Sequence, residues 1–341
     1  MPSSILFVLL GSLGDVCRSL PVLCLLRERW PGARISWAVD ERWASLAAQH
    51  PAADRLVVFP RPRTARGLAA FARALRAEPY DLALDLQRIL KSGLCSRLSR
   101  APRRLGFNPA DAKEFNHLFA TEWIRPVSPD TSKLVHYLAF AEHLGIAVPK
   151  ALPFGLGHLS DRRRLPAPVQ ELVERGYVAV VAGSSWRSKD WSPAGYRALL
   201  AHIAKDSRLG IVLVGDASQR DVIAGLDVGR RVVNLVGSTS LVELAAVLGC
   251  ARAAAGPDTG AGHLAAALGT PYVALLGPTR PSRVAPHGYE HLVVTGSVVC
   301  DGCGRRCRRR AGRCMDAIAA DAVWSKLRAA AESRESGPKA G

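Results

Sequence analysis

The sequence lacks the features that mark membrane-spanning and secreted proteins. None of its 341 residues belongs to a run of about 18 uncharged apolar residues, so we expect no transmembrane helix. The apolar residues 4–10 are too few for a signal peptide, no basic residue precedes them, and Gly11 and Asp15 follow at once. We therefore interpret residues 4–10 as a first strand and expect a cytoplasmic protein.

Acidic residues and lysine are both scarce. The chain has 29 acidic residues against 46 basic ones, and 38 of the basic residues are arginine because lysine occurs at only eight positions. The formal net charge of +17 favours polyanionic partners: nucleic acid, an anionic membrane, or a phosphorylated or carboxylated substrate. No nucleic-acid-binding module is present, and aromatic residues do not interleave with the basic ones. We therefore expect an anionic substrate or a membrane surface and no nucleic acid.

Apolar stretches that are typical of buried strands alternate with helical segments along both halves of the chain. The expected strands are residues 5–10, 34–39, 56–59 and 82–86, then 177–182, 211–214, 232–234, 251–255 and 272–276. Strands and helices that alternate at this spacing predict parallel sheets with helical crossovers. The fold class is therefore α/β, with two Rossmann-like domains that face each other across a cleft.

Composition also indicates where the domains divide. We expect an N-terminal Rossmann-like domain over residues 1–155 and a C-terminal Rossmann-like domain over residues 173–332. The proline-rich, charged residues 156–172 are the expected linker, and the polar residues 333–341 are an expected disordered tail.

A glycine-rich segment, residues 256–281, lies between two expected strands and contains one short helix. Asp258, Thr259 and Gly260 lead into that helix, and His263 lies in its first turn. Unpaired N–H groups and the positive end of the helix dipole suit a phosphate, and glycines at 260 and 262 leave no wall of side chains. The alternative is a glycine-rich turn in which Asp258 only caps the helix.

The polar loop at residues 183–193 also follows a strand and opens a helix. Ser184, Ser185 and Lys189 could contact a diphosphate through two hydroxyls and an ammonium group. The loop does not have the G-x-x-x-x-G-K spacing of a Walker A motif. An ordinary polar loop remains the alternative.

Asp15 begins the helix after the first strand, where a carboxylate can simply compensate the helix dipole. Facing a donor with a phosphate leaving group, the same carboxylate can take a proton from an attacking hydroxyl. Polar and basic side chains near other strand ends could grip an anionic acceptor, or could form a solvated basic face. These candidate acceptor residues are Arg61, Arg63, Arg66, Gln87, Arg88 and Lys91.

Four motifs together carry a resemblance to a known family: GSLGD at residues 11–15, DLQRILKS at 85–92, GSSWRSKDWSP at 183–193 and GPDTGAGHLAAALGTPYVALLGPT at 256–279. The chain resembles the ADP-heptose:lipopolysaccharide heptosyltransferases, glycosyltransferase family 9, from about residue 5 to 318. The resemblance implies the GT-B fold and an inverting, metal-independent transfer with no cofactor. It implies ADP-heptose as donor, a lipopolysaccharide-core or lipid A-linked acceptor, and a peripheral position at the cytoplasmic face of the inner membrane.

The resemblance also implies that residues 1–155 form the acceptor-binding domain and residues 173–332 the nucleotide-sugar-binding domain. It further implies roles for individual residues. Asp15 is the expected general base, and the Arg61–Arg66 loop and Lys91 are expected to meet the acidic inner core. The expected donor-binding residues are Ser184, Ser185, Lys189, Gln219, Asp258, Thr259, Gly260 and His263. Two positions depart from the family pattern. Gln219, or alternatively Asp216, takes the place of a ribose-binding Glu that is common in the family, and Arg88 stands where Gly is common.

Two alternatives to this transferase remain open at the level of sequence. One is another sugar-nucleotide enzyme of the same fold, with a different donor or with epimerase activity. The other, based on the net charge, is a basic nucleic-acid-binding protein.

Four cysteines form a C-x₂-C-x₃-C-x₆-C cluster near the C-terminus: Cys300, Cys303, Cys307 and Cys314. This spacing is compatible with a structural metal site or a disulfide pair, but we favour free thiols. The expected reaction requires no metal.

Overall fold

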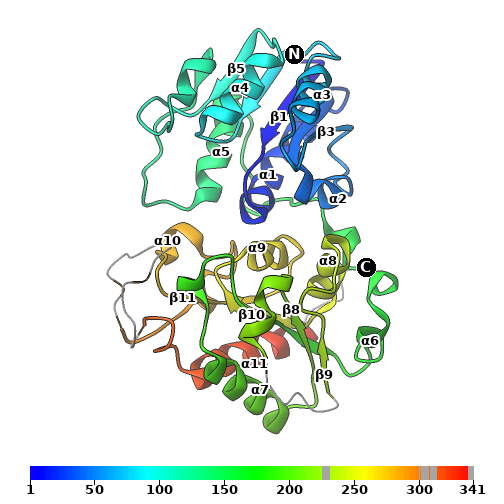
Figure 1. Ribbon diagram of the computed structural model, residues 1–341, viewed down its shortest axis with the longest axis vertical. Coiled ribbons are helices and arrows are strands. Elements are labelled where there is room, and N and C mark those ends of the chain that lie inside the picture. The colour runs from blue at the N-terminus through cyan, green and yellow to red at the C-terminus, as the bar shows by residue number, and fades with distance from the viewer. Residues whose placement is uncertain (225–230, 299, 301–306, 308–312, 337–341) are drawn as a thin grey trace. The chain divides into compact units, whose positions relative to one another are not determined.

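Buried apolar strands and amphipathic helices build two α/β units. The computed structural model describes residues 1–224, 231–298, 300, 307 and 313–336. The chain divides into unit 1, Met1–Leu156, and unit 2, Gly157–Gly341. Each unit has its own six-stranded parallel sheet with helices packed on it (Figure 1). Both units are therefore Rossmann-like, as the sequence predicts.

The sheet of unit 1 has the strand order β3-β2-β1-β4-β5-β6. Side chains at both faces of the central strand are buried: Ile5, Phe7 and Leu9 on one face, and Leu6 and Val8 on the other, are all 0% exposed. Continuous apolar runs of this kind fit a parallel sheet that is covered on both faces. The strands are β1 (Ser4–Leu9), β2 (Arg34–Asp40), β3 (Arg55–Phe59), β4 (Leu82–Asp85), β5 (Arg103–Gly106) and β6 (Glu122–Trp123).

Helices cover this sheet and complete its core. On one face, Phe71 and Leu75 of one helix and Cys95 of the next pack with Leu6 and Val8 of β1. Helices α1 and α5 pack against each other. The helices of unit 1 are α1 (Leu13–Arg29), α2 (Ala44–Ala47), α3 (Ala65–Leu75), α4 (Leu90–Leu98) and α5 (Lys133–His143), with 3-10 turns η1 (Glu41–Trp43) and η2 (Asn116–Phe119).

The sheet of unit 2 repeats the pattern with the strand order β12-β11-β10-β7-β8-β9. Its strands are β7 (Tyr177–Val181), β8 (Gly210–Val214), β9 (Val232–Asn234), β10 (Ala253–Pro257), β11 (Tyr272–Leu276) and β12 (Val294–Thr295). Its helices are α6 (Ala167–Gln170), α7 (Pro193–Asp206), α8 (Leu241–Cys250), α9 (Gly260–Ala267), α10 (Pro281–Val284) and α11 (Ala320–Ser336). Five 3-10 turns complete it: η3 (Gly157–Leu159), η4 (Arg162–Arg164), η5 (Arg187–Lys189), η6 (Ala217–Val222) and η7 (Glu290–Leu292).

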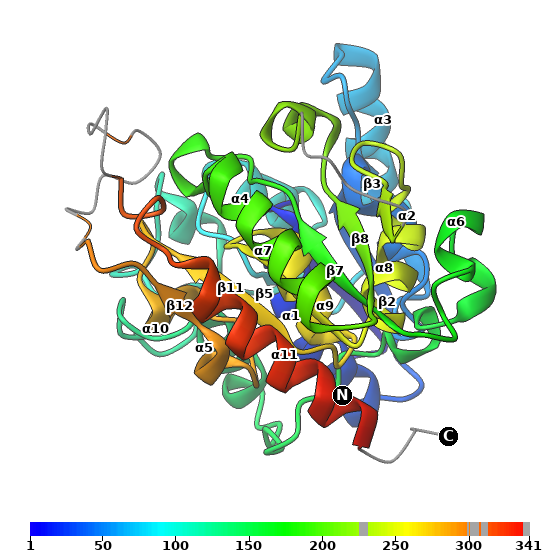
Figure 2. The same ribbon diagram turned by 90° about the horizontal axis from the view of Figure 1, so that it is seen from below.

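Helices α7 and α11 lie side by side on one face of this sheet (Figure 2). Tyr196 and Ile203 of α7 and Trp324 and Leu327 of α11 enter the core beneath them together with Val180 of β7. The C-terminal helix is therefore an integral layer of unit 2, although it is the last element in the chain.

Two predictions about segments need correction. Residues 157–172 of the expected linker, residues 156–172, instead belong to unit 2, where η3 and η4 contact α8 and where Leu159, Leu165 and Val169 are buried. The expected tail overlaps α11, which continues to Ser336 because Arg334 donates to the carbonyls of Ala251 (2.9 Å) and Gly249 (3.0 Å). Residues 337–341 lie outside the described residues.

The strand orders locate the edge at which each unit binds ligands. Strand order reverses between β1 and β4 in unit 1 and between β7 and β10 in unit 2. In open α/β sheets, ligands bind beyond the carboxyl ends of the strands at such a reversal. The loops after these four strands contain Asp15, Gln87, Lys189 and Asp258, all of which the sequence singles out.

In the part of the chain that the structure describes, no helix is both long and apolar enough to cross a bilayer.

Candidate functional site

An ion pair joins the two loops at the strand reversal of unit 2. Lys189, in η5 after β7, places its Nζ 2.6 Å from Oδ2 of Asp258, which follows β10. The two side chains are only 11% and 9% exposed. The ammonium group of Lys189 also lies 4.2 Å from the centre of the Trp186 ring. A cation is therefore held in a mostly buried position at the place where this fold binds anions.

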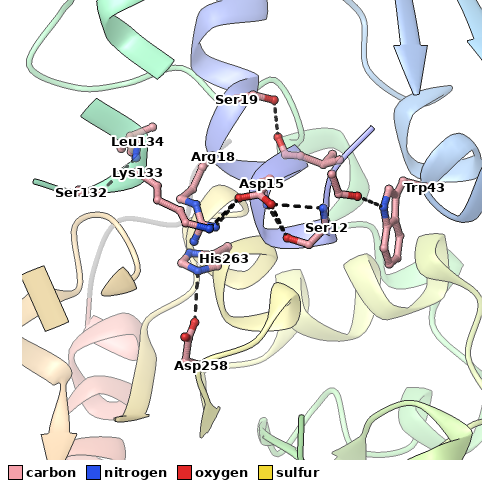
Figure 3. A network of polar contacts seen from close by, with 12 residues as sticks. Ser12, Asp15, Arg18, Ser19, Trp43, Ser132, Lys133, Leu134, Asp258 and His263 are labelled. Carbon is pink, nitrogen blue, oxygen red and sulfur yellow. Dashed lines mark hydrogen bonds and ion pairs between the residues drawn. The ribbon is translucent and has the colours of Figure 1, made fainter. Parts of the chain in front are cut away.

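His263 contacts Asp258 from the first turns of α9 (Figure 3). Its Nε2 lies 3.7 Å from Oδ1 of Asp258, and the residue is 5% exposed. Burial alone would raise the pKa of Asp258, but the hydrogen bond from His263 and the charge of Lys189 outweigh it and hold that pKa well below its ordinary value. Asp258 is therefore a carboxylate that fixes two nitrogen donors, and a bare helix-capping role does not account for it.

The N-terminus of α9 has no side-chain cap. Thr259 occupies the cap position with extended backbone, and its side chain makes no capping hydrogen bond. Within the described residues, the buried hydroxyls of Thr259 and Thr279 have no hydrogen-bond partner. Gly260 begins the helix, so its first N–H groups are directed at the same edge of the sheet. Free N–H groups beside unpartnered hydroxyls fit the oxygens of a phosphate.

Gly256 and Gly262 leave room for the ring of Tyr272 rather than an open path for a ligand. A Cβ at Gly262 would lie 2.7 Å from Cε1 of Tyr272, and one at Gly256 would lie 2.7 Å from its Oη. The Tyr272 hydroxyl donates to the carbonyl of Pro257 at 3.0 Å, which holds the ring in place. The interpretation of Gly262 as the absence of a side-chain wall is therefore wrong, since the ring of Tyr272 fills that space.

Ser184 and Ser185 differ in their surroundings. Ser184 is 9% exposed; its N–H donates to Oδ1 of Asp190 at 2.7 Å, and its Oγ accepts from the N–H of Trp186 at 3.3 Å. Ser185 is exposed. Ser184 thus shapes the loop that carries Lys189, whereas Ser185 lies on its open side.

Gln219 completes a turn at the end of β8. Its Oε1 accepts from the N–H of Asp216 at 2.9 Å, while Oδ1 of Asp216 accepts from the N–H of Ser218 at 2.9 Å. Gln219 is 8% exposed. This reciprocal capping box commits the carbonyl oxygen of Gln219 to the protein backbone, which sequence reasoning did not foresee.

In unit 1, Asp15 lies in the first turn of α1 and binds three side chains (Figure 3). Its Oδ2 accepts from Oγ of Ser12 at 2.7 Å, and its Oδ1 lies 2.9 Å from Nη2 of Arg18 and 3.3 Å from Nζ of Lys133. Burial raises the pKa of Asp15, but Arg18 and Lys133 outweigh burial and hold this pKa far below its ordinary value. Asp15 is therefore ionised, which a proton acceptor must be, and it also caps α1.

Gln87 borders the same loop. Its Oε1 accepts from the N–H of Leu10 at 2.8 Å. A Cβ at Gly11 would lie 3.1 Å from Oδ2 of Asp15 and 3.2 Å from Nε2 of Gln87. The end of β4 thus brings an amide group next to the carboxylate at the end of β1, as the predicted sheet implies.

Three of the predicted acceptor residues gather around the end of β3. Arg63 and Lys91 lie 5.6 Å and 4.6 Å from the centre of the Phe59 ring. Arg61 binds the fully buried Asp40 with both Nε (3.0 Å) and Nη2 (2.9 Å). Burial, together with the charge of Arg63, lowers the pKa of Lys91. These three cations form a positive cluster in which an anion would relieve repulsion.

Arg66 and Arg88 are placed differently. Arg66 is exposed in the first turn of α3. The guanidinium group of Arg88 lies 5.0 Å from the centre of the Phe107 ring, and its Nη1 is 3.5 Å from the carbonyl of Asp111. The structure therefore does not place Arg88 against the Phe59 ring with Lys91.

Sequence reasoning missed Asp85, which is 3% exposed at the end of β4. It accepts from Nδ2 of Asn116 at 2.8 Å and from the N–H of Gln87 at 3.0 Å. Burial outweighs these hydrogen bonds and raises the pKa of Asp85 to about 7. Asp85 belongs to the DLQ motif, so the residue itself could be seen in the sequence. Its hydrogen-bond donor Asn116 is 31 residues away, so no local pattern indicated their pairing.

The cysteine cluster is described only in part. Cys303 lies outside the described residues. Cys314 is 5% exposed, and a Cβ at Gly277 would lie 2.7 Å from its Sγ. Burial and the neighbouring Cys300 raise the pKa of Cys314 to about 11. Among the described residues, no three His, Cys, Asp or Glu side chains are arranged to hold a metal ion.

Comparison with protein families gives one match that covers most of the chain. The family described as "Glycosyltransferase family 9 (heptosyltransferase)" matches residues 68–309. This range spans more than half of unit 1 and most of unit 2, including the loops of Lys189 and Asp258.

Curated proteins and solved structures give concordant similarities. Lipopolysaccharide heptosyltransferase 1 of Pseudomonas aeruginosa is 28% identical over 320 residues, which cover 88% of this chain and 85% of that protein. The structure of E. coli heptosyltransferase WaaC with ADP has a TM-score of 0.76 and 25% identity. WaaC with ADP-2-deoxy-2-fluoro heptose has a TM-score of 0.75 and 26% identity. Each comparison covers 96% of this chain and 99% of the other chain.

Proposed function

The chain belongs to glycosyltransferase family 9, the heptosyltransferases, and from this membership we propose that it transfers heptose from ADP-heptose to the inner core of lipopolysaccharide. A relative named lipopolysaccharide heptosyltransferase 1 supports the acceptor. Solved structures of WaaC with ADP and with a fluorinated ADP-heptose support the donor.

The single observation that carries the proposal is the Lys189–Asp258 ion pair beside the uncapped N-terminus of α9. On donor binding, the ammonium group of Lys189 and the first N–H groups of α9 bind the diphosphate. Thr259 contributes a hydroxyl that has no partner within the described residues, and Ser185 contributes one from the exposed side of its loop. Asp258 and His263 hold these groups in position and contact the sugar of the donor. Gln219, at the neighbouring strand end, lies on the side of the ribose.

The acceptor binds to unit 1 through its anionic groups. Arg61, Arg63 and Lys91 form a positive cluster at the end of β3. Arginine binds phosphate and carboxylate groups with two parallel hydrogen bonds, which suits an acidic inner-core sugar. Gln87, Arg66 and Arg88 extend this acceptor surface on either side.

In the proposed reaction, an acceptor hydroxyl attacks the anomeric carbon from the side opposite the diphosphate. The new C–O bond forms as the bond to the β-phosphate oxygen breaks, and that oxygen leaves with the electron pair. The hydroxyl proton passes to Asp15. The configuration at the anomeric carbon is therefore inverted.

The low pKa of Asp15 constrains when the proton moves. A weakly basic carboxylate takes a proton from an alcohol only after the alcohol has become acidic, which happens as its bond to the oxocarbenium-like carbon forms. Proton transfer is thus late, and most of the rate acceleration comes from the positive charge that receives the departing diphosphate. Lys189 and α9 supply this charge, so we propose that the reaction requires no metal ion and no cofactor.

We also place the reaction at the cytoplasmic face of the inner membrane. The acceptor is anchored by lipid, and the net charge of +17 favours association with an anionic surface.

The test is a transfer assay with ADP-heptose and heptose-free lipopolysaccharide, in which ADP release is followed with and without the acceptor. The proposal predicts ADP release only when acceptor is present, and thermal stabilisation by ADP-sugars in preference to UDP- or GDP-sugars. Conversion of the sugar nucleotide without acceptor would instead support an epimerase, and stabilisation by UDP- or GDP-sugars would indicate another donor.

A further inference from the structure

Exposed apolar side chains concentrate on one part of unit 1. Among the described residues, nine large hydrophobic side chains are exposed, and five of these lie between residues 90 and 123. They are Leu90 (49% exposed), Leu94 (47%), Phe115 (73%), Leu118 (70%) and Trp123 (44%). We call these five residues the apolar patch. A cluster of this kind on a water-exposed surface indicates an interaction site.

Contacts between α4 and the segment around η2 bring the members of the patch together. Leu90 and Leu94 lie one turn apart on the exposed stripe of α4. The N–H of Leu90 donates to Oε2 of Glu114 at 3.1 Å, and a Cβ at Gly93 would lie 2.6 Å from Phe119. Phe115 and Leu118 flank or belong to η2, which packs on α4 (Figure 1).

Trp123 extends the patch along the edge strand β6. Its Nε1 donates to the carbonyl of His117 at 3.2 Å, so the indole lies beside η2. A tryptophan with a satisfied N–H and an exposed ring is typical of side chains at a membrane–water boundary.

The backbone holds Phe115 outward at a conformational cost. Glu114 and Phe115 have φ of 52° and 57°, in the left-handed region, which is uncommon for a bulky aromatic residue. Such a conformation is strained for residues other than glycine. The N–H of Lys113 donates to the carbonyl of Arg88 at 2.8 Å, and the N–H of Asn116 donates to the carbonyl of Lys113 at 3.0 Å. These backbone hydrogen bonds maintain the conformation. A strained turn that exposes an aromatic ring to water is consistent with a ring that becomes buried when the protein binds its partner.

Charge around the patch identifies the partner. Residues 88–125 contain eight basic and three acidic residues. Of the acidic ones, Glu122 is paired with Arg103 at 2.7 Å and Glu114 accepts from the backbone of Leu90. Arg97, Arg100 and Lys113 are exposed. Apolar side chains rimmed by cations fit an anionic lipid surface, in which the rings and leucines enter the acyl region and the cations meet phosphates.

We propose that the apolar patch docks unit 1 onto an anionic lipid bilayer. A second copy of the chain is disfavoured as occupant, because pairing this face with itself would bring two positively charged rims together. The proposal rests on the proposed function in one respect, namely that the acceptor is carried by a lipid. Lys91, one residue after Leu90, contacts Phe59 with Arg63, so docking through α4 places the acceptor-binding cluster next to the bilayer.

The test measures partition of the full chain onto sedimented vesicles of phosphatidylethanolamine and phosphatidylglycerol, and onto vesicles of phosphatidylcholine alone. Phe115→Ser/Leu118→Ser should weaken partition onto the anionic vesicles by about a hundredfold or more, since two large apolar side chains no longer enter the bilayer. Lys113→Ala should weaken it by about fivefold on anionic vesicles only. The control Val58→Ser/Leu68→Ser removes two exposed apolar side chains at β3 and α3 and should change nothing. Equal partition of Phe115→Ser/Leu118→Ser and wild type overturns the proposal.

Two further measurements separate the alternatives. Sedimentation velocity without lipid should show the same species for wild type and Phe115→Ser/Leu118→Ser; self-association lost only in the variant would make this face an interface between copies and overturn the proposal. Transfer to a delipidated acceptor should be unchanged in the variant, and its loss would place the patch in the acceptor site instead. If no acceptor is glycosylated while wild type still binds vesicles through the patch, the proposed function fails and the docking surface stands.

Discussion

Three carboxylates at strand ends illustrate how surroundings assign roles to residues of one type. Asp15 and Asp258 are largely buried, yet neighbouring cations keep the pKa of each well below its ordinary value. Asp85 is more deeply buried, and the hydrogen bonds that it accepts come from neutral groups, so its pKa rises to about 7. The first two are permanent charges, and the third changes its charge near neutral pH.

Replacing Asp15 by Asn tests its role as base. Asn retains an oxygen that can accept from Ser12 at the start of α1, so the variant should keep its fold. We expect kcat to fall by about 10²–10⁴-fold, because the proton acceptor is lost, with ADP affinity unchanged. Asp161→Asn, at the N-terminus of η4 in unit 2, is the control and should leave kcat unchanged. A parallel loss of ADP affinity and thermal stability in the Asp15 variant would show a structural role.

Lys189→Ala tests the diphosphate site. Removing a charged hydrogen bond of about 1.5–3 kcal/mol should raise the Kd for ADP by about tenfold to a hundredfold in calorimetric titration. The variant leaves Asp258 buried without its cation, so Lys189→Ala/Asp258→Asn is measured beside it to separate binding from stability. Lys205→Ala, at the end of α7, should bind ADP normally. Unchanged affinity in both Lys189 variants would remove this residue from the site.

The pKa of Asp85 predicts a pH dependence of stability. Because its folded-state pKa of about 7 exceeds the ordinary value of about 3.9, the folded state binds a proton that the unfolded state releases between these pH values. Stability should therefore fall as pH rises from about 4 to 7, by up to about 4 kcal/mol, and level off above. Urea midpoints for unit 1 should show this slope in wild type and lose it in Asp85→Asn. Asp81→Asn, whose pKa is lowered, should keep the slope, and a flat wild-type profile would contradict the account.

At the scale of elements, the β10–α9–β11 segment depends on the packing of Tyr272. Gly262→Ala should destabilise unit 2 by about 1–3 kcal/mol, because the ring that its Cβ would meet at 2.7 Å is held by the Pro257 carbonyl. The same change should weaken ADP binding by displacing the N-terminus of α9. Gly32→Ala, where an added Cβ meets nothing within 4 Å, is the matched control for thermal and urea unfolding. Equal stability of the two variants would show that the ring of Tyr272 can move aside for the added Cβ.

Most strands with a strong local pattern were predictable. The predicted strands 232–234 and 272–276 match β9 and β11. Strand β5 was missed because it begins with Arg103 and Arg104, and β6 because it has only two residues. Helix α11 was missed although Val323, Trp324, Leu327 and Ala330 recur at helical spacing.

The candidate site was predictable to the same extent. Glycine-rich loops at strand ends point to Asp15, Lys189 and Asp258 because parallel strands end at one edge of a sheet. Lys133, which binds Asp15, lies 118 residues away in sequence and carries no local signal. The use of Gln219 in a capping box likewise follows from a turn geometry that its position alone does not reveal.

For the whole molecule, the proposed reaction assigns the general base and the acceptor to unit 1 and the donor to unit 2. Unit 1 carries an ionised carboxylate and a cluster of cations at its sheet edge, and unit 2 carries a buried ammonium beside an uncapped helix. The carboxylate of unit 1 and the ammonium of unit 2 follow strands at the reversals, so each unit uses the ligand-binding position of its own fold, whereas the cation cluster of unit 1 gathers at the end of the edge strand β3.

The central claim is that the chain moves one heptose from ADP-heptose onto an inner-core acceptor. The most direct measurement is the mass spectrum of heptose-free lipopolysaccharide after incubation with the protein and ADP-heptose. The account predicts an acceptor heavier by a single heptose, with wild type and Asp161→Asn giving the same product and Asp15→Asn giving almost none. An acceptor of unchanged mass beside wild-type protein that binds ADP-heptose would contradict it.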